Sequence, residues 1–310
     1  MRKFKSLKTK IIVCTSGIVC LTAILNLFVG IFSSYQSITK NVERDLQSVG
    51  QTAEVAINNS LRNIKLGIES TAKLDIIGKT GATKSDILNT LNKQKKELGY
   101  QSLSIVDKSG TIISSDSNLN NKNIADQEYF KKALAGETYI SSTTYDVNKK
   151  LCVIACSPVS NNNYQGIVMA TLDPQIFSNI IKDIVVGKTG NVFMMDKSGI
   201  IIANIRAANV EKRKVAEVYK LMDAGKSGIT TYAYDTGDRI CYYAPIKDTD
   251  GWSYGVVAPI AEMTSSIWLT VIGLSVASVL CVLLGVFLSL INAQSIANPI
   301  LLVCRRLELL

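Results

Sequence analysis

A segment at residues 138–146 carries the side chains best suited to contact a small molecule. Alternate positions hold Tyr139, Ser141, Thr143 and Tyr145, and a strand would place all four on one face. Hydroxyls donate and accept hydrogen bonds while the flanking rings exclude water, so the set suits a small polar ligand. The alternative is an edge strand whose polar side chains are merely solvated, because Thr and Tyr are common in strands.

Catalytic and metal chemistry find little support in the composition. The chain contains no histidine, which removes Ser-His-Asp and Cys-His catalysis and His-ligated metals. The acidic residues show no catalytic spacing, so we expect no enzyme, metal site or cofactor; an anchored outer-surface hydrolase is the alternative. Cys152 and Cys156 lie four positions apart on an expected strand, about 13 Å from each other and too far for a disulfide.

One stretch of the chain occurs twice. Residues 106–113 and 195–202 each contain an apolar run, then Asp-Lys-Ser-Gly, then a second apolar run. Asp tolerates turn geometry and Gly supplies positive φ, so each copy predicts two strands joined by a tight hairpin. Two further landmarks occur at nearly the same offset: Pro158 with Pro245, and residues 166–168 with residues 255–257. Their order predicts a duplicated module.

Two uncharged runs are long enough to cross a membrane. They cover residues 11–32 and 267–291, and as helices they would reach about 33 Å or more. Basic residues precede the first run, and Arg305 and Arg306 come after the second. The positive-inside rule therefore predicts cytoplasmic termini and an extracytoplasmic segment at 33–266. A cleaved signal peptide is the competing interpretation of the first run, although its apolar core is longer than the usual length of about 7–15 residues.

The net charge of +9 lies mainly in these flanks. Between the spans, 27 basic residues face 24 acidic ones, a balance of only +3. A basic patch for nucleic acid is therefore unsupported, and we expect no nucleic-acid partner.

The region between the spans predicts helices and then strands. Residues 33–74 predict a stalk helix with a seam at Val42, Leu46, Val49, Ala53, Ala56 and Ser60. This seam meets a second subunit or packs on the chain's own sheets. A shorter helix is expected at 84–98. Strands are expected at 103–106, 112–115, 138–145, 151–157 and 167–172, then at 191–195, 200–203, 229–234, 239–244 and 252–258, with one helix in each module at 129–134 and 211–223. Pro299 is expected to begin a last helix.

The order and membrane placement of these parts resemble the double Cache sensor region of bacterial transmembrane receptors. The matching stretches are 126–133 (DQEYFKKA), 136–141 (GETYIS), 166–173 (GIVMATLD) and 251–257 (GWSYGVV), and residues 298–300 (NPI) resemble the opening of a HAMP linker helix. The likeness covers about residues 30–305. It implies a small-molecule pocket in the membrane-distal module and a mainly structural proximal module. It also implies an output module after HAMP, so we expect a fragment or a receptor without its own output.

The resemblance also implies which residues contact the ligand. Tyr129 would border the pocket, while Phe130 packs in the core. Amino-acid-binding members carry an arginine and an aspartate where this chain has Gln127 and Thr171, so a free amino acid would lose both charged contacts. We therefore expect a small polar metabolite that is not a typical amino acid. The expected contacts are Asp126, Gln127, Tyr129, Tyr139, Ser141, Thr143, Tyr145, Asp146 and Thr171, with the two aspartates available to a cationic group.

The expected fold class is α+β, with two PAS-like antiparallel-sheet modules on a long N-terminal stalk helix, flanked by two transmembrane helices. The expected boundaries are a basic head at 1–10, the first span at 11–32, the stalk at 33–74, the membrane-distal, ligand-binding module at 75–184, the membrane-proximal module at 185–262, the second span at 267–291 and the start of a HAMP linker at 292–310.

The resemblance predicts extracytoplasmic small-molecule sensing and signalling across the cell membrane. The first choice is the input region of a methyl-accepting chemotaxis receptor. The alternatives are the input region of a sensor histidine kinase or diguanylate cyclase, and a membrane-anchored binding protein without output. The expected partners are the membrane, a second copy in a homodimer, and a cytoplasmic signalling module or kinase complex if the chain continues.

Overall fold

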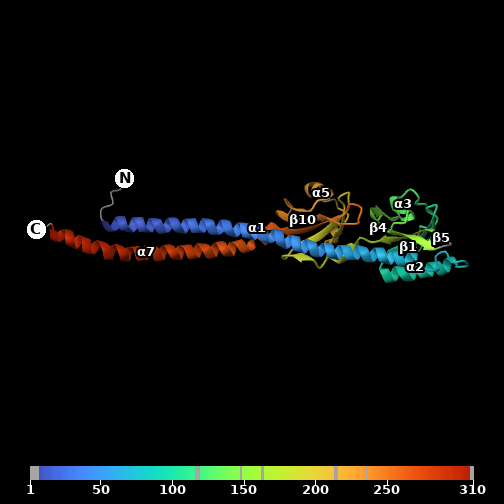
Figure 1. The fold of residues 1–310 in the computed structure, drawn as a ribbon, viewed down its shortest axis with the longest axis horizontal. Helices are drawn as coiled ribbons and strands as arrows, with labels where there is room; N and C mark the ends of the chain where they lie inside the picture. The colour runs from blue at the N-terminus through green and yellow to red at the C-terminus, as the bar shows by residue number, and fades with distance from the viewer. Residues whose placement is uncertain are drawn as a thin grey trace. The chain divides into compact units, whose positions relative to one another are not determined.

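The computed structural model describes residues 7–115, 119–146, 149–161, 164–212, 216–234 and 236–307. Residues 43–262 form one compact unit, and residues 1–42 and 263–310 form another. The first unit holds two antiparallel sheets and their helices, while the second holds apolar helical segments (Figure 1). This mixture of helix and sheet confirms the predicted α+β class.

Helix α1 (Leu7–Ala72) runs without a break from the first apolar run into the predicted stalk. In the compact unit its buried face includes Leu46, Ala53, Ile57 and Ile68, at helical spacing. Part of the predicted seam therefore packs on the chain's own domain. Gly50 shows how close this packing is, because a Cβ at that position would lie 2.4 Å from the Tyr242 ring.

Helix α2 (Lys84–Leu98) has the predicted bounds because its ends are well capped. Thr83 and Asp86 form a reciprocal capping box at its start, and Gly99 ends it in the left-handed conformation with φ of 70°.

The first sheet has the strand order β2-β1-β5-β4-β3, and every neighbouring pair is antiparallel. The strands are β1 Ser102–Asp107, β2 Ile112–Ser115, β3 Tyr139–Tyr145, β4 Leu151–Asn161 and β5 Tyr164–Leu172. Helix α3 (Glu128–Leu134) covers one face, where Phe130 and Ala133 pack against side chains of β4 and β5. Helices α1 and α2 lie on the other side (Figure 1).

The second sheet comes after helix α4 (Gln175–Ile181) and repeats the same plan. Its order is β6-β7-β11-β10-β9, with β8 also paired to β7. The strands are β6 Val185–Val186, β7 Gly190–Met195, β8 Ile201–Asn204, β9 Gly228–Tyr232, β10 Arg239–Pro245 and β11 Ser253–Pro259. The short helices are η1 Ala207–Asn209, α5 Ala216–Asp223 and α6 Ile260–Met263.

The two hairpin turns confirm the predicted duplication in atomic detail. In the first copy the Asp107 carboxylate accepts hydrogen bonds from the backbone N–H groups of Ser109 and Thr111, each at 2.9 Å. In the second copy the Asp196 carboxylate accepts from Ser198 and Ile200, at 2.9 and 3.0 Å. The glycines that end both turns have φ near +80°, a backbone conformation that residues with a Cβ rarely adopt.

The strand registers confirm one of the two further landmarks and correct the other. In the first sheet Pro158 pairs with Ile167, and Ile167 pairs with Val106 on the next strand. In the second sheet Pro245 pairs with Ser253, and Ser253 pairs with Met195. Since Val106 and Met195 are equivalent, the two prolines are equivalent as well. Gly166 and Gly255 are not equivalent. Gly166 pairs with Asp107, whose counterpart in the second module is Asp196. Gly255 pairs instead with Phe193, three positions before Asp196. The shared glycine was a coincidence of sequence.

Two helix starts differ from the predictions. Helix α5 is described from Ala216, and residues 213–215 before it lie outside the described part of the chain. Glu211 does not begin the helix, because it has φ of 71° and its backbone N–H donates to the Ile201 carbonyl in β8. Helix α7 (Ser265–Leu307) continues through Pro299 instead of restarting there. A proline's fixed φ is compatible with a helix at the loss of one hydrogen bond. Residues 1–6 and 308–310, in the predicted basic head and linker, lie outside the described part of the chain.

Two helices are long and apolar enough to cross a membrane, namely the N-terminal part of α1 and residues Trp268–Asn292 of α7. Within their unit the two helices are in contact. The Thr15 and Ser289 hydroxyls form a hydrogen bond, and a Cβ on Gly30 would lie 3.0 Å from Leu274. Small residues that permit close helix contact are typical of membrane helix pairs.

Candidate functional site

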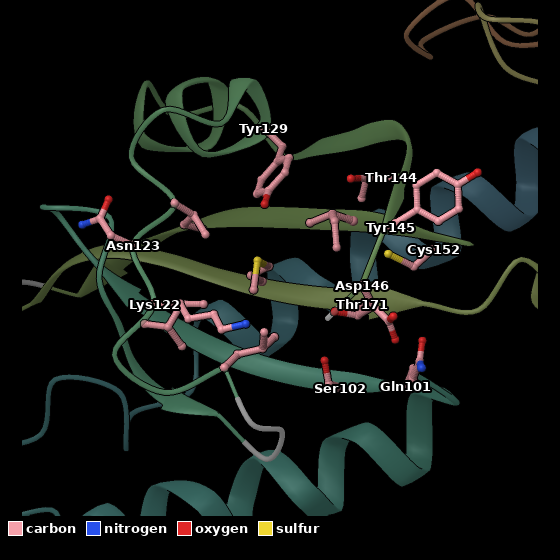
Figure 2. Close-up of a pocket in the computed structure, with 15 residues that line it drawn as sticks. Gln101, Ser102, Lys122, Asn123, Tyr129, Thr144, Tyr145, Asp146, Cys152 and Thr171 are labelled. Atoms are coloured by element: carbon pink, nitrogen blue, oxygen red, sulfur yellow. The ribbon is translucent and has the colours of Figure 1, made fainter. Parts of the chain in front are cut away.

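A cavity of about 320 Å³ lies between α3 and the sheet of the first module. This volume is at the lower end of the range for small-molecule sites. The walls come from all five strands, from α3 and from the loop that precedes it (Figure 2). The lining residues are Gln101, Ser102, Ile112, Leu119, Lys122, Asn123, Ile124, Tyr129, Thr144, Tyr145, Asp146, Cys152, Ile154, Met169 and Thr171.

The lining of the cavity includes one positively charged and one negatively charged side chain. Figure 2 shows the Lys122 side chain extending into the cavity, with Asp146, Gln101 and Ser102 toward the opposite end. Asp146 is held in the turn between β3 and β4, where the Lys150 backbone N–H donates to its carboxylate at 2.8 Å. A ligand that carries both a negative and a positive group would find a counter-charge for each.

The remaining lining is neutral. Tyr129 points from α3 into the cavity (Figure 2), and burial together with the nearby Cys156 and Cys152 raises its pKa, so its hydroxyl stays protonated. Burial, with smaller contributions from Asp146 and Asp173, raises the pKa of Cys152 to about 12. The Cys152 thiol therefore stays protonated near neutral pH.

The predicted face of four alternating side chains on β3 is wrong, because the strand contains a bulge. Ile140 pairs with Ala155 but Thr143 pairs with Val153, so β3 has one more residue than β4 over this interval. The extra residue reverses the alternation. As a result Thr144, opposite Cys152, lines the cavity, whereas the Thr143 hydroxyl donates to the Asp196 carboxylate of the second module.

A smaller hollow of about 170 Å³ lies between the start of α3, strand β3 and two residues of the second module. It contains five of the predicted residues, namely Gln127, Tyr129, Tyr139, Ser141 and Thr143, together with Glu128, Ser142, Thr144, Lys197 and Asp250. The Ser142 hydroxyl donates to the Asp250 carboxylate at 2.8 Å, and Lys197 pairs with the same carboxylate at 2.6 Å. Burial opposes ionisation, but the bonds from Lys197 and Ser142 outweigh it and lower the pKa of Asp250.

The structure thus divides the predicted contacts between two places. Tyr129, Tyr145, Asp146 and Thr171 line the larger cavity, and Tyr129 also borders the smaller hollow. Asp126 lines neither of them among the described residues.

Sequence reasoning missed five polar residues of the larger cavity: Gln101, Ser102, Lys122, Asn123 and Thr144. For Lys122 no local pattern gave a signal. It stands in a polar loop, and that loop is fixed over the sheet by hydrogen bonds such as the one from the Ile112 backbone N–H to the Lys122 carbonyl, at 2.9 Å.

Comparison with known proteins gives a family and a fold. The sequence profile of the Cache domain (dCache_1) matches residues 33–267. No curated protein sequence matches the chain. Among solved structures, the chain is similar to the ligand-binding domain of the Pseudomonas fluorescens chemoreceptor CtaA in complex with L-isoleucine, with 17% identity, a TM-score of 0.59, and coverage of 76% of this chain and 99% of that one.

Two further structures are similar in fold. One is the extracellular domain of mmHK1S-Z2, described as a candidate histidine kinase, with 14% identity, a TM-score of 0.55, and coverage of 71% and 97%. The other is an extracellular ligand-binding receptor from Desulfohalobium retbaense DSM5692, with 17% identity and a TM-score of 0.56. The match covers 68% of this chain but only 40% of the Desulfohalobium protein.

The predicted exclusion of amino acids is wrong. CtaA, which has this fold, is seen in complex with L-isoleucine, L-leucine and L-serine. The exclusion rested on Gln127 and Thr171 as the residues that would have to carry charge. In the structure Gln127 lies outside the larger cavity, and Lys122 and Asp146 supply charges from other positions.

Proposed function

The chain belongs to the Cache domain family, and we propose that it is the sensing region of a transmembrane receptor that binds a small amino acid or a related zwitterion in its first module. The observation that carries this proposal is the cavity of about 320 Å³ with Lys122 and Asp146 among its lining. Lys122 would contact the ligand carboxylate and Asp146 its ammonium group. Tyr129, Tyr145 and Thr171 would contact the remainder of the ligand.

The bulged strand β3 would link the ligand cavity to the second module. Thr144 and Tyr145 line the cavity. The neighbouring Ser142 and Thr143 hydroxyls donate hydrogen bonds to Asp250 and Asp196 of the second module. A ligand that moves β3 would therefore strain these contacts. Such a ligand needs only to favour one of two packings by a few kcal/mol to shift the receptor's state.

We propose a chemotaxis receptor as the receptor class, since the fold is similar to that of the CtaA ligand-binding domain. A sensor histidine kinase is the second candidate because the fold is also similar to that of the mmHK1S-Z2 domain. The two classes differ in the cytoplasmic output domain, which would lie beyond the second span. The residues near Pro299 would then begin a HAMP linker that connects this span to the output domain.

The function is tested by calorimetry on the full chain in lipid nanodiscs, titrated with each standard L-amino acid. We expect at least one to bind with a Kd between about 1 µM and 1 mM, which corresponds to roughly −8 to −4 kcal/mol. Absence of heat and of a thermal shift with every one of them would refute the amino-acid proposal. To test the receptor class, residues 1–307 would be fused to the cytoplasmic half of a methyl-accepting receptor and, separately, of a kinase, and output measured on ligand addition.

The topology proposal places residues 33–266 outside the cytoplasm and both termini inside. Single cysteines would be introduced at Asn120 and at Lys5 in a chain whose own cysteines are replaced by serine or alanine. A membrane-impermeant maleimide added to intact spheroplasts should label position 120 and leave position 5 unlabelled until the cells are lysed. Labelling at position 5 before lysis would reverse the proposed orientation.

A further inference from the structure

The second module contains a small pocket at the place that corresponds to the larger cavity of the first. Asn191 lies 89 residues after Ser102, the same offset that separates the two turn aspartates. Ser102 pairs with Thr171, and Asn191 pairs with Val257, so these positions are equivalent across the duplication. All four residues line their respective pockets.

The same correspondence extends to the outer strands. Thr171 pairs with Ile154 and Val257 pairs with Cys241, which makes Cys152 in the first module equivalent to Arg239 in the second. Their partners on the edge strands are Thr144 and Tyr232. Two residues further along, Asp146 of the first module corresponds to Tyr234 of the second.

These replacements change the charge of the described pocket lining from balanced to positive. A thiol is replaced by the guanidinium of Arg239, and the carboxylate of Asp146 is replaced by the phenol of Tyr234. Arg206 joins the lining from the turn after β8, and three asparagines add amide donors. The described lining of the second pocket contains no carboxylate. The first pocket has both charges, whereas the second is cationic.

Arg239 is buried with only part of its hydrogen-bonding capacity used. Its side chain is 8% exposed, its Nη2 donates to the Thr236 hydroxyl at 3.1 Å, and its guanidinium carbon lies 4.3 Å from the centre of the Tyr234 ring. Its Nε is buried and has no hydrogen-bond partner among the described residues. No carboxylate of the described residues forms an ion pair with Arg239. Because a buried cation without a counter-charge is costly, an anion at this place would stabilise the module.

The pocket's volume limits the size of the anion. It is about 30 Å³, compared with about 320 Å³ for the cavity of the first module. A single water molecule needs about 10–15 Å³ by the same kind of measure. The space suits a halide or a carboxylate of one or two carbons, and it excludes an amino acid.

We propose that the second module binds a small monovalent anion, a halide or a short carboxylate, at Arg239. Arg239 would donate from its Nε, with Arg206 and the Asn191 amide as further donors. This site is separate from the ligand cavity and makes the stability of the second sheet depend on the anions outside the cell.

The test is thermal unfolding of the full chain in detergent, in sodium gluconate, chloride, formate or acetate at equal ionic strength. Gluconate is too large for the pocket and serves as the reference anion. We expect chloride, formate or both to raise Tm by about 2–4 °C at concentrations well above Kd. A preference for chloride over formate would assign a halide, and the reverse a carboxylate. Equal Tm values in all four salts would overturn the proposal.

Variants separate this site from general salt effects. Arg239→Gln should abolish the anion-dependent shift and Arg206→Gln should reduce it. Lys247→Gln, which removes an exposed cation of the same module, and Lys122→Gln, in the first module, should leave it intact. A shift that persists in Arg239→Gln would refute the assignment. If that variant does not fold, the chloride-35 resonance is measured with the unaltered chain. Broadening of this resonance that formate reverses supports the site. If the resonance is not broadened and formate does not raise Tm, the proposal is overturned.

Because the ligand proposal concerns Lys122 and Asp146, the two tests are independent. A Lys122 variant that loses amino-acid binding but keeps the anion-dependent Tm shift would not contradict the anion site. Loss of that shift in Arg239→Gln, with unchanged amino-acid binding, would not contradict the ligand proposal.

Discussion

Replacing Trp252 by alanine should destabilise the compact unit by about 3–5 kcal/mol, the usual loss for a large buried aromatic side chain. Trp252 is 1% exposed and stands just before β11. Its ring meets that of Phe177 edge-on, with 5.2 Å between centroids and an interplanar angle of 86°. Phe177 lies on α4, the helix that connects the two sheets. The substitution would leave a cavity where the connecting helix is fixed to the second sheet.

Urea unfolding monitored by circular dichroism measures this loss, with Trp252→Phe and Trp268→Ala as controls. Trp252→Phe keeps an aromatic ring against Phe177 and should lose less. Trp268 is the only other tryptophan and is 71% exposed on α7, so its removal should have little effect on the compact unit. Equal destabilisation by Trp252→Ala and Trp268→Ala would show that the contact with Phe177 contributes nothing specific.

The fold was predictable where the sequence carries local physical signals. The Asp-Lys-Ser-Gly turns indicated both hairpins, since the carboxylate and the glycine are what the turn requires. Thr83, Asp86 and Gly99 determined both ends of α2 by capping chemistry. The start of α5 was not predictable in this way, because the backbone of Glu211 is held by a bond to Ile201 that depends on the folded loop.

The site was only partly predictable because its lining depends on register and loop placement. A single extra residue in β3 turned Thr143 away from the cavity and brought Thr144 to it. A strand bulge of this kind leaves no mark in an alternating sequence, since both residues are threonines. Lys122 was missed for a different reason, because a loop lysine becomes a site residue only when the loop is folded over the sheet.

The error about the ligand arose from the same limitation. The prediction places the charged contacts by position along the chain, so in it Gln127 and Thr171 decide the ligand's charge. In three dimensions the cavity receives its cation from the loop before α3 and its anion from the turn after β3. The function of a binding site depends on the geometry of its charges, and different sequence positions can supply the same geometry.

Removing either charge of the cavity should weaken the binding of a free amino acid by about tenfold to a hundredfold. A hydrogen bond to a charged group contributes about 1.5–3 kcal/mol, and each 1.4 kcal/mol is a factor of about ten in Kd. We expect Lys122→Met to act through the ligand carboxylate and Asp146→Asn through its ammonium group, as the lining of the cavity indicates. Calorimetry with the best-binding amino acid measures both effects.

Ligand analogues make this prediction specific to each end of the ligand. The matching amine, which lacks the carboxylate, should bind the unaltered chain weakly, and Lys122→Met should not weaken it further. The matching carboxylic acid, which lacks the amine, should bind the Asp146→Asn variant as tightly as it binds the unaltered chain. Asp126→Asn is the matched control, because this aspartate was predicted from sequence but lines neither hollow among the described residues. If Asp126→Asn weakened binding while Asp146→Asn did not, the ammonium group would be bound at the position that the sequence indicated, and the assignment to Asp146 would be wrong.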